Sequence, residues 1–244
     1  MAGKKDVWQT MEQEQKLYNE LNLGDMKDYN KFYIYSIIAH STAIEGSTLS
    51  EMDAQLLFDE GITKKGTMIE HLMNLDLKRA YEYAAIEAGR KTEITPDFLK
   101  NLNALIMQHT GGPSYMDYKK VPNNVNRLCD ELNKRLDAKD LRDTYTLSFD
   151  AHFYLVTIHP WRDGNGRACR LLMNYIQFYH GIVPTKVHKE DKDEYIKALA
   201  AGQEKESTLP FREFMAKQHV KTLKNEINHF KKGQNKHDTF TLLF

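Results

Sequence analysis

Residues 149–180 read FDAHFYLVTIHPWRDGNGRACRLLMNYIQFYH, two apolar segments on either side of a short polar run. In the first segment Phe149, Phe153 and Val156 lie three or four positions apart, which places them on one face of a helix. That helix must end before Pro160, because a residue that precedes proline avoids helical backbone angles. The second segment has the same spacing, so this stretch predicts two helices joined by a tight turn.

Helical spacing of apolar residues continues outward in both directions from this pair. It marks the segments 32–39, 69–84, 98–106, 125–136 and 211–230, the last of which is long enough for one or two helices. Thr95 and Pro96 supply an N-cap and a first-turn proline, and Gly89 and Gly111 are stop signals for two of these helices. No segment alternates with period two over a sustained length, so the sequence predicts an all-α fold.

The composition argues against several classes of protein. Lys and Arg together number 34, as do Asp and Glu, so there is no excess positive charge with which to bind a nucleic-acid backbone. Two cysteines in 244 residues cannot build a disulfide framework. The first residues form no signal-peptide core, and the most apolar stretch, 32–39, is too short to span a bilayer. We therefore expect a cytoplasmic protein with no nucleic-acid or membrane partner, and the composition leaves open whether it forms a homo-oligomer.

The polar run between the two helices, residues 159–170 (HPWRDGNGRACR), carries the chemistry. Gly164, Asn165 and Gly166 allow a sharp turn and a close approach to a ligand. The helix that begins here directs unpaired backbone N–H groups and the positive end of its dipole at whatever lies in front of it. This is an anion site of the kind that phosphates occupy.

Four side chains of this run suit a nucleotide phosphate. Arg167 and Arg170 lie three positions apart on one side of the new helix, where the dipole disfavours cations unless they face a polyanion. Asp163 is a carboxylate that would hold a divalent metal against phosphates, and His159 can exchange a proton near neutral pH. Each feature alone is common in turns and solvated helix ends. Their combination predicts a nucleotide-phosphate site with a base beside it.

This run resembles the signature of the Fic (Fido) family, H-P-F-x-[D/E]-G-N-G-R-x-x-R, with Trp161 in place of the phenylalanine. The similarity extends over roughly Thr95–His219. It divides the chain into an N-terminal helical region (1–94), a Fic catalytic core (95–219), and a C-terminal helix and tail (220–244).

The resemblance implies an all-α core with a short β-hairpin flap that transfers AMP from Mg-ATP to a protein hydroxyl and releases pyrophosphate. It assigns His159 as the base that deprotonates a Ser, Thr or Tyr of a target protein or of the chain itself, and Asp163 as the ligand of Mg²⁺. The nucleotide phosphates would be held by the rest of the signature: Gly164, Asn165, Gly166, Arg167 and, at the γ-phosphate, Arg170. The kinase-like branch of the family carries lysine at the position of Gly166, so AMP transfer is favoured over phosphorylation.

A second motif lies at residues 41–46 (STAIEG) and resembles the family's inhibitory motif, [S/T]-x-x-x-E-[G/N]. The apolar segment before it predicts a helix that ends near Gly46, so Glu45 faces the negative end of the helix dipole and is disfavoured there. A nearby cation would remove this conflict, and the resemblance indicates Arg170. Glu45, with Ser41, would then hold the arginine that the γ-phosphate needs, as in the class II members with an N-terminal inhibitory helix. The alternative is an exposed glutamate before a turn.

The loop at 111–121 falls where the family has its flap, a hairpin whose edge aligns an extended target by main-chain hydrogen bonds. Tyr115, Tyr118 and Val121 are its strand and target-binding candidates. The two tyrosines are also candidates for self-modification. The alternative is a plain connecting loop.

Two other functions stay open at this stage. Glu45 could orient a water molecule that removes AMP from a modified protein, which would make the chain a de-AMPylating hydrolase. An inactive Fic-fold interaction module is the second alternative, although it would not need His159, Asp163 and Arg170 together. A metal-binding protein is disfavoured, because the two cysteines are isolated and the ten histidines show no ligand spacing.

Overall fold

The computed structural model describes residues 6–25, 27–111, 121–138 and 140–241. Throughout these ranges the chain forms helices and no β-strand, as the apolar spacing predicts. The ten α-helices of the described residues are α1 (Val7–Glu20), α2 (Lys27–Ile44), α3 (Glu51–Glu60), α4 (Met68–Gly89), α5 (Pro96–Ile106), α6 (Val121–Lys134), α7 (Leu141–Ile158), α8 (Asn165–Tyr179), α9 (Lys192–Glu204) and α10 (Leu209–Thr241). Two short 3₁₀ helices, η1 (Leu23–Asp25) and η2 (Lys189–Asp191), precede α2 and α9.

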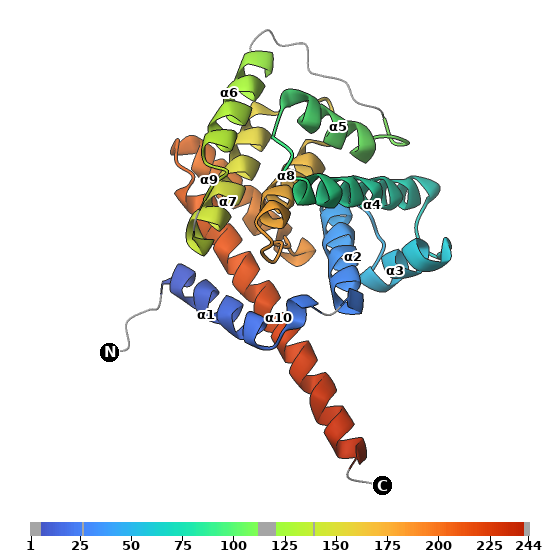
Figure 1. The fold of residues 1–244 in the computed structure, drawn as a ribbon. Helices are drawn as coiled ribbons and strands as arrows, with labels where there is room; N and C mark the ends of the chain where they lie inside the picture. Colours follow the sequence, from blue (N-terminus) through green and yellow to red (C-terminus); the bar gives the residue numbers. More distant parts are fainter. Residues whose placement is uncertain (1–5, 26, 112–120, 139, 242–244) are drawn as a thin grey trace.

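Helices α7 and α8 form the centre of the molecule, and the other helices pack around them (Figure 1). Helices α4 and α5 contact α8, α6 contacts α7, and α2 contacts α3, α4 and α8. Helix α1 packs along α10, whose C-terminal part extends away from the rest of the protein (Figure 1). Among the described residues, no helix is both long and apolar enough to cross a membrane.

Two clusters of buried side chains hold these helices together. One fills the space between α4, α5, α6, α7 and α8 and includes Leu77, Leu102 and Leu172. Trp161 belongs to this cluster and is almost fully buried, so it anchors the turn between α7 and α8. The second cluster packs α7 against α10 through Phe149 and Phe211. Apolar burial on both sides therefore fixes the position of the α7–α8 turn.

Several helix ends lie where the sequence predicts them. The Thr95 hydroxyl accepts a hydrogen bond from the Phe98 N–H at 3.1 Å, and Pro96 occupies the first helical position of α5. Helix α4 ends at Gly89, and α7 ends at Ile158, before the proline. The segment 211–230, for which the spacing allowed one or two helices, lies within the single helix α10.

Helix α5 ends at Ile106, earlier than the predicted stop at Gly111. The Gln108 N–H here bonds to the Leu105 carbonyl, three residues back, and a buried carboxylate on α4 takes the next N–H. Asp76 accepts a hydrogen bond from the His109 N–H at 2.8 Å and contacts His109 Nδ1 at 2.6 Å. Because this N–H is bound to a side chain, it is not available to continue the helix.

The prediction that Val121 belongs to a flap strand is wrong. Val121 is the first residue of α6 and is buried against the core. Pro122 follows it, and proline suits the first turn of a helix, where an N–H has no intrahelical partner. The other two flap candidates, Tyr115 and Tyr118, lie outside the described residues.

A buried carboxylate on α7 provides a direct test of this packing. Asp150 is 2% exposed and receives two hydrogen bonds from Arg212 of α10, at 2.6 and 2.7 Å, and one from Arg135 at 3.1 Å. Asp150→Ala should lower the free energy of unfolding by about 3 kcal/mol, because it leaves partly buried arginines without their counter-charge. Chemical denaturation of Asp150→Ala and of the exposed control Asp130→Ala measures this, and equal stability of the two would contradict it.

Candidate active site

The turn between α7 and α8 positions the candidate base. His159 ends α7 in the left-handed conformation (φ 51°), and its N–H donates to the Leu155 carbonyl at 3.0 Å. Gly164 precedes α8, also with a left-handed φ of 78°. Two left-handed residues five positions apart reverse the chain within a short distance, which leaves the His159 side chain exposed at the start of α8.

Asn165 fixes the orientation of His159. Its Oδ1 accepts a hydrogen bond from the Trp161 N–H at 3.1 Å, and its Nδ2 donates to the Trp161 carbonyl at 2.6 Å. These two bonds determine which end of the amide is nitrogen, and Nδ2 also lies 3.1 Å from His159 Nε2. Because an amide nitrogen only donates, Nε2 carries the lone pair that a general base needs. The Asn165 side chain thus supports the histidine, and only its backbone N–H is left for an anion.

The N-terminus of α8 has no side-chain cap. An added Cβ would be crowded at both Gly164 and Gly166, and Gly164 also has the left-handed backbone that favours glycine. A Cβ at Gly164 would lie 2.7 Å from Asn103 Nδ2, and one at Gly166 would lie 2.5 Å from Glu45 Oε1. The first turn of α8 is therefore closely approached by side chains of α5 and of the residue that follows α2.

Arg167 is a buried cation whose hydrogen bonds are incomplete. Its NH2 lies 3.1 Å from Met107 Sδ and 3.6 Å from Asp163 Oδ1, whereas Nε and NH1 are buried without a partner. Burial lowers the pKa of Arg167, and the charges of Glu45 and Asp163 offset part of this effect. Unpaired buried donors are costly, so an anion bound at this position would be stabilised by them.

Arg170 connects α8 to the predicted inhibitory motif. Its Nε donates to Ser41 Oγ at 2.8 Å, and its NH2 donates to the Ser41 carbonyl at 3.0 Å and to Glu45 Oε1 at 2.7 Å. Burial alone would lower the pKa of Arg170, but Glu45 and Tyr195 outweigh it and raise the pKa. Glu45 therefore contacts Arg170, the partner that the resemblance to the Fic family indicates.

The Glu45 carboxylate is ionised in this arrangement. Its side chain is 34% exposed, and its burial would raise the pKa, but Arg170 and then Arg167 lower the pKa below its ordinary value. A negative charge thus lies against Arg170 in the first turns of α8, where the charge of Arg167 also acts on it. This is the position in which an anionic ligand of the helix would also be placed.

Asp163 suits a divalent metal. Its side chain is 70% exposed, and its Oδ1 accepts a hydrogen bond from the Gly164 N–H at 2.5 Å. An exposed carboxylate beside an anion-binding turn is a ligand that Mg²⁺ takes together with phosphate oxygens. The residues present therefore fit a magnesium ion held jointly by Asp163 and a nucleotide.

Three neighbours of this site are not predicted by the sequence. Asn103 and Met107, at the end of α5, contact Asp163 and Arg167. Tyr195 of α9 lies 3.5 Å from Arg170 NH1 and 2.9 Å from His152 Nε2. Only Tyr195 has a sequence signal, because the segment DEYIKAL that contains it resembles the family core.

Comparisons with known proteins agree with this geometry. Residues 93–177 match the Fic/DOC family. The protein adenylyltransferase Fic of Nematostella vectensis is 29% identical over 207 residues, which cover 79% of this chain and 48% of that protein. The protein of the same name from Drosophila melanogaster is 27% identical over 214 residues, covering 82% of this chain and 43% of that protein. The chain thus spans about half the length, or less, of these curated relatives.

Solved structures show the same fold. Fic-1 (residues 134–508) from C. elegans superimposes with a TM-score of 0.77 and 22% identity, covering 93% of this chain and 73% of the other. A Fic domain containing signaling protein from Bacteroides thetaiotaomicron gives a TM-score of 0.75 and 21% identity, covering 93% and 97%. Together with the turn at His159 and the helix end at Gly164, these similarities show that the chain has an all-α Fic fold, that residues 93–177 match the Fic/DOC family, and that the chain is distantly similar to the protein adenylyltransferases.

Proposed function

We propose that the chain is an autoinhibited protein adenylyltransferase that moves AMP from Mg-ATP to a Ser, Thr or Tyr hydroxyl of a target protein or of itself. The observation that carries this proposal is the contact between Glu45 and Arg170 at 2.7 Å. It joins the inhibitory motif to the arginine that the family uses for the terminal phosphate. Glu45 would then lie within the site that binds the nucleotide.

The geometry supports a direct transfer. His159 Nε2 takes the proton of the target hydroxyl, whose oxygen forms a bond to the α-phosphorus while the bond from that phosphorus to the bridging oxygen breaks and pyrophosphate leaves. The N-terminus of α8 and the unpaired donors of Arg167 hold the phosphates. Magnesium, when bound at Asp163, supplies positive charge next to the phosphates. The Nε2 lone pair is engaged by Asn165 Nδ2 at 3.1 Å, so this hydrogen bond must be exchanged for one with the target hydroxyl before the proton is transferred.

Inhibition follows from charge and space. The Glu45 carboxylate uses the Arg170 NH2 and lies close to Gly166, where a phosphate would approach the helix. A phosphate placed there would meet a negative charge and find the arginine already bound. ATP would then bind without its γ-phosphate in the productive position.

Glu45→Gly should increase incorporation of label from ATP labelled on the α-phosphate. A hydrogen bond between charged groups contributes about 1.5–3 kcal/mol, so its removal should raise transfer roughly 10- to 100-fold. Glu60→Gly, the same change at the exposed end of α3, is the matched control and should stay at the wild-type level. Glu45→Gly combined with His159→Asn should incorporate at least about 10²-fold less label than Glu45→Gly alone.

Hydrolytic removal of AMP is a second candidate, favoured by the ionised and partly exposed carboxylate of Glu45 within the site. If Glu45→Gly binds ATP but stays unlabelled, the transferase proposal fails. Release of AMP from a previously modified protein, compared between wild type and Glu45→Gly, then tests the hydrolase. Loss of release in the variant would support it.

A further inference from the structure

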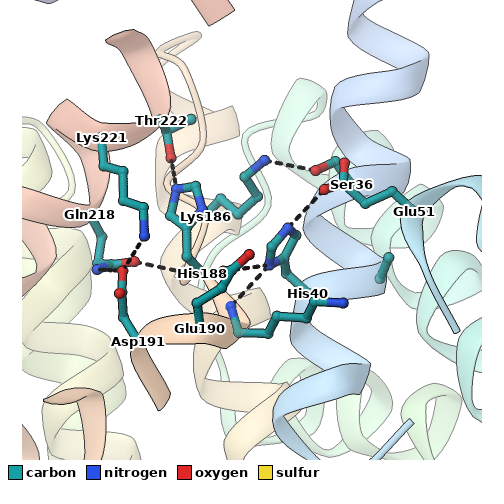
Figure 2. A network of polar contacts seen from close by, with 12 residues as sticks. Ser36, His40, Glu51, Lys186, His188, Glu190, Asp191, Gln218, Lys221 and Thr222 are labelled. Carbon is teal, nitrogen blue, oxygen red and sulfur yellow. Dashed lines mark hydrogen bonds and ion pairs between the residues drawn. The ribbon is translucent and has the colours of Figure 1, made fainter. Parts of the chain in front are cut away.

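A second polar cluster begins at His40, next to Ser41 in α2, and has no part in the proposed transfer. It joins His40 of α2 to His188 and Glu190, which lie just before and within η2 (Figure 2). One potential ligand atom from each residue lies within 4.8 Å of the other two. The two histidines are buried, whereas the Glu190 side chain is 57% exposed. This is a combination of side chains that binds transition-metal ions.

The hydrogen bonds of His40 prepare it to bind a cation. Its Nδ1 accepts from the Lys189 N–H at 2.9 Å, so Nδ1 carries the lone pair and the proton is on Nε2. That proton faces Glu51 Oε1, at 2.9 Å. A carboxylate behind the distal nitrogen is the usual support of a metal-ligating histidine, because it fixes the tautomer and makes the ligand more basic.

His188 has a similar arrangement. Its Nε2 lies 3.0 Å from Thr222 Oγ1 of α10, which leaves Nδ1 as the nitrogen that can bind a ligand. The rings of His40 and His188 meet edge to face with centroids 5.4 Å apart.

Glu190 supplies the third ligand and the charge. Its Oε2 lies 3.8 Å from His40 Nδ1. The cluster borders an open cavity of about 250 Å³, which Glu51, Glu226 and His229 also line. Lys186 is the cation of this cavity, and its Nζ is bound to Ser36 Oγ at 2.7 Å. Among the lining side chains three carboxylates exceed this one positive charge, and the nearby Lys221 is paired with Asp191 at 2.6 Å, so a dication can be accommodated.

We infer that His40, His188 and Glu190 form a site for a divalent transition-metal ion of the Zn²⁺ type, with water completing the coordination. Zn²⁺ takes imidazole nitrogens and carboxylate oxygens at about 2.0–2.2 Å, so the three atoms must move closer together on binding. Glu190 is exposed and can move, and the Lys189 N–H gives up its hydrogen bond to Nδ1 in exchange for the metal.

The site has a consequence for inhibition, and this step rests on the proposed function. His40 directly precedes Ser41 and lies five residues before Glu45, so a metal bound here connects the inhibitory helix to the segment that leads into α9. Helix α9 carries Tyr195, which lies 3.5 Å from Arg170 NH1, whereas Ser41 and Glu45 belong to the inhibitory motif. A bound cation would thus hold these three partners of Arg170 in place and strengthen the inhibited arrangement.

Binding is tested with the tag-free full chain after treatment with a chelator. Titration with Zn²⁺ in a calorimeter, and with Co²⁺ followed by its visible absorption, should show one equivalent bound by wild type. Glu190→Gln should bind at least tenfold more weakly, because it removes a charged ligand while keeping the shape of the side chain. Glu194→Gln, the same change on an exposed glutamate of α9, is the matched control and should bind like wild type. Absence of saturable binding, or equal affinity in Glu190→Gln and wild type, would overturn the site.

The regulatory step has its own readout. Hydrogen exchange of the α2 amides around Ser41 should slow when Zn²⁺ is added to wild type, and should not change in Glu190→Gln. Slower exchange together with lower incorporation of AMP, in wild type only, would support the coupling. Tight binding with unchanged exchange would leave the metal site standing and refute its link to inhibition. Because binding is measured without ATP, failure of the transferase proposal does not affect that result.

Discussion

Replacing His159 with asparagine in a Glu45→Gly background should lower AMP transfer by roughly 10²- to 10⁴-fold, which is the usual contribution of a general base. Asparagine is the informative substitution because His159 has a left-handed backbone (φ 51°), which asparagine adopts more readily than alanine. The variant therefore removes the basic nitrogen and leaves the turn intact. Transfer is followed by incorporation of α-phosphate label into the protein.

Two controls separate chemistry from folding in this experiment. His71→Asn, in the first turn of α4, should transfer AMP at the rate of the Glu45→Gly parent. The His159 variant itself should bind ATP as the parent does, because its side chain is exposed and holds no other element in place. Transfer above one tenth of the parental rate would show that another group accepts the proton.

Gly164→Ala should have the second large effect, on stability as well as activity. The backbone at Gly164 is left-handed (φ 78°), and an added Cβ would lie 2.7 Å from Asn103 Nδ2 and 2.9 Å from Met107 Sδ. The left-handed conformation costs about 1 kcal/mol for alanine, and overpacking adds about 1–3 kcal/mol. We expect the free energy of unfolding to fall by about 3 kcal/mol in total.

Gly61 provides the matched control for this prediction. It has nearly the same backbone angle (φ 74°), but an added Cβ would meet nothing within 4 Å. Gly61→Ala should therefore lose only about 1 kcal/mol, the conformational part. In the Glu45→Gly background Gly164→Ala should also reduce transfer by roughly 10²-fold, since it displaces the N-terminus of α8. Equal denaturation midpoints for the two alanine variants would show that Asn103 and Met107 move away from the added Cβ at position 164 without loss of stability.

Local signals explain why much of the fold was predictable. Short-range signals mark the ends of several helices, and the structure has helix ends at these places. They are Thr95 with Pro96, Gly89, and the Gly-Asn-Gly turn at the start of α8. Helix α1 was missed because Gln15 occupies one of its buried positions and interrupts the apolar stripe. Helix α3 was missed because its ten residues bury only Ala54 and Leu57, although Ser50 and Asp53 form a capping box at its start.

Part of the candidate site could likewise be predicted from the sequence, and part could not. Residues 159–170 adjoin one another in sequence, so their chemistry could be recognised from their order. Asn103 and Tyr195 reach the site from α5 and α9, and only the packing of these helices brings them to Asp163 and Arg170. The roles assigned to the signature residues, the domain boundaries and the inhibitory function of Glu45 remain predictions.

The same limit applies to the predicted absence of a metal site. The histidines show no ligand spacing along the chain, because His40 and His188 are brought together only when α2 packs near η2. Spacing rules detect ligands that share a helix or a loop. They cannot detect ligands that two distant elements contribute singly.

The absence of a side chain at Gly166 affects both the position of Glu45 and the access of a ligand to the start of α8. The space left by its missing side chain admits the Glu45 carboxylate, and under the proposed function a nucleotide phosphate would use the same space to approach the backbone of α8. A larger residue at this position would expel the inhibitor and narrow the entrance for the substrate in one step. Under the proposed function, a change in the strength of inhibition that leaves nucleotide access intact would therefore come from the α2 side, at Ser41, at Glu45 or at the contacts that anchor their helix.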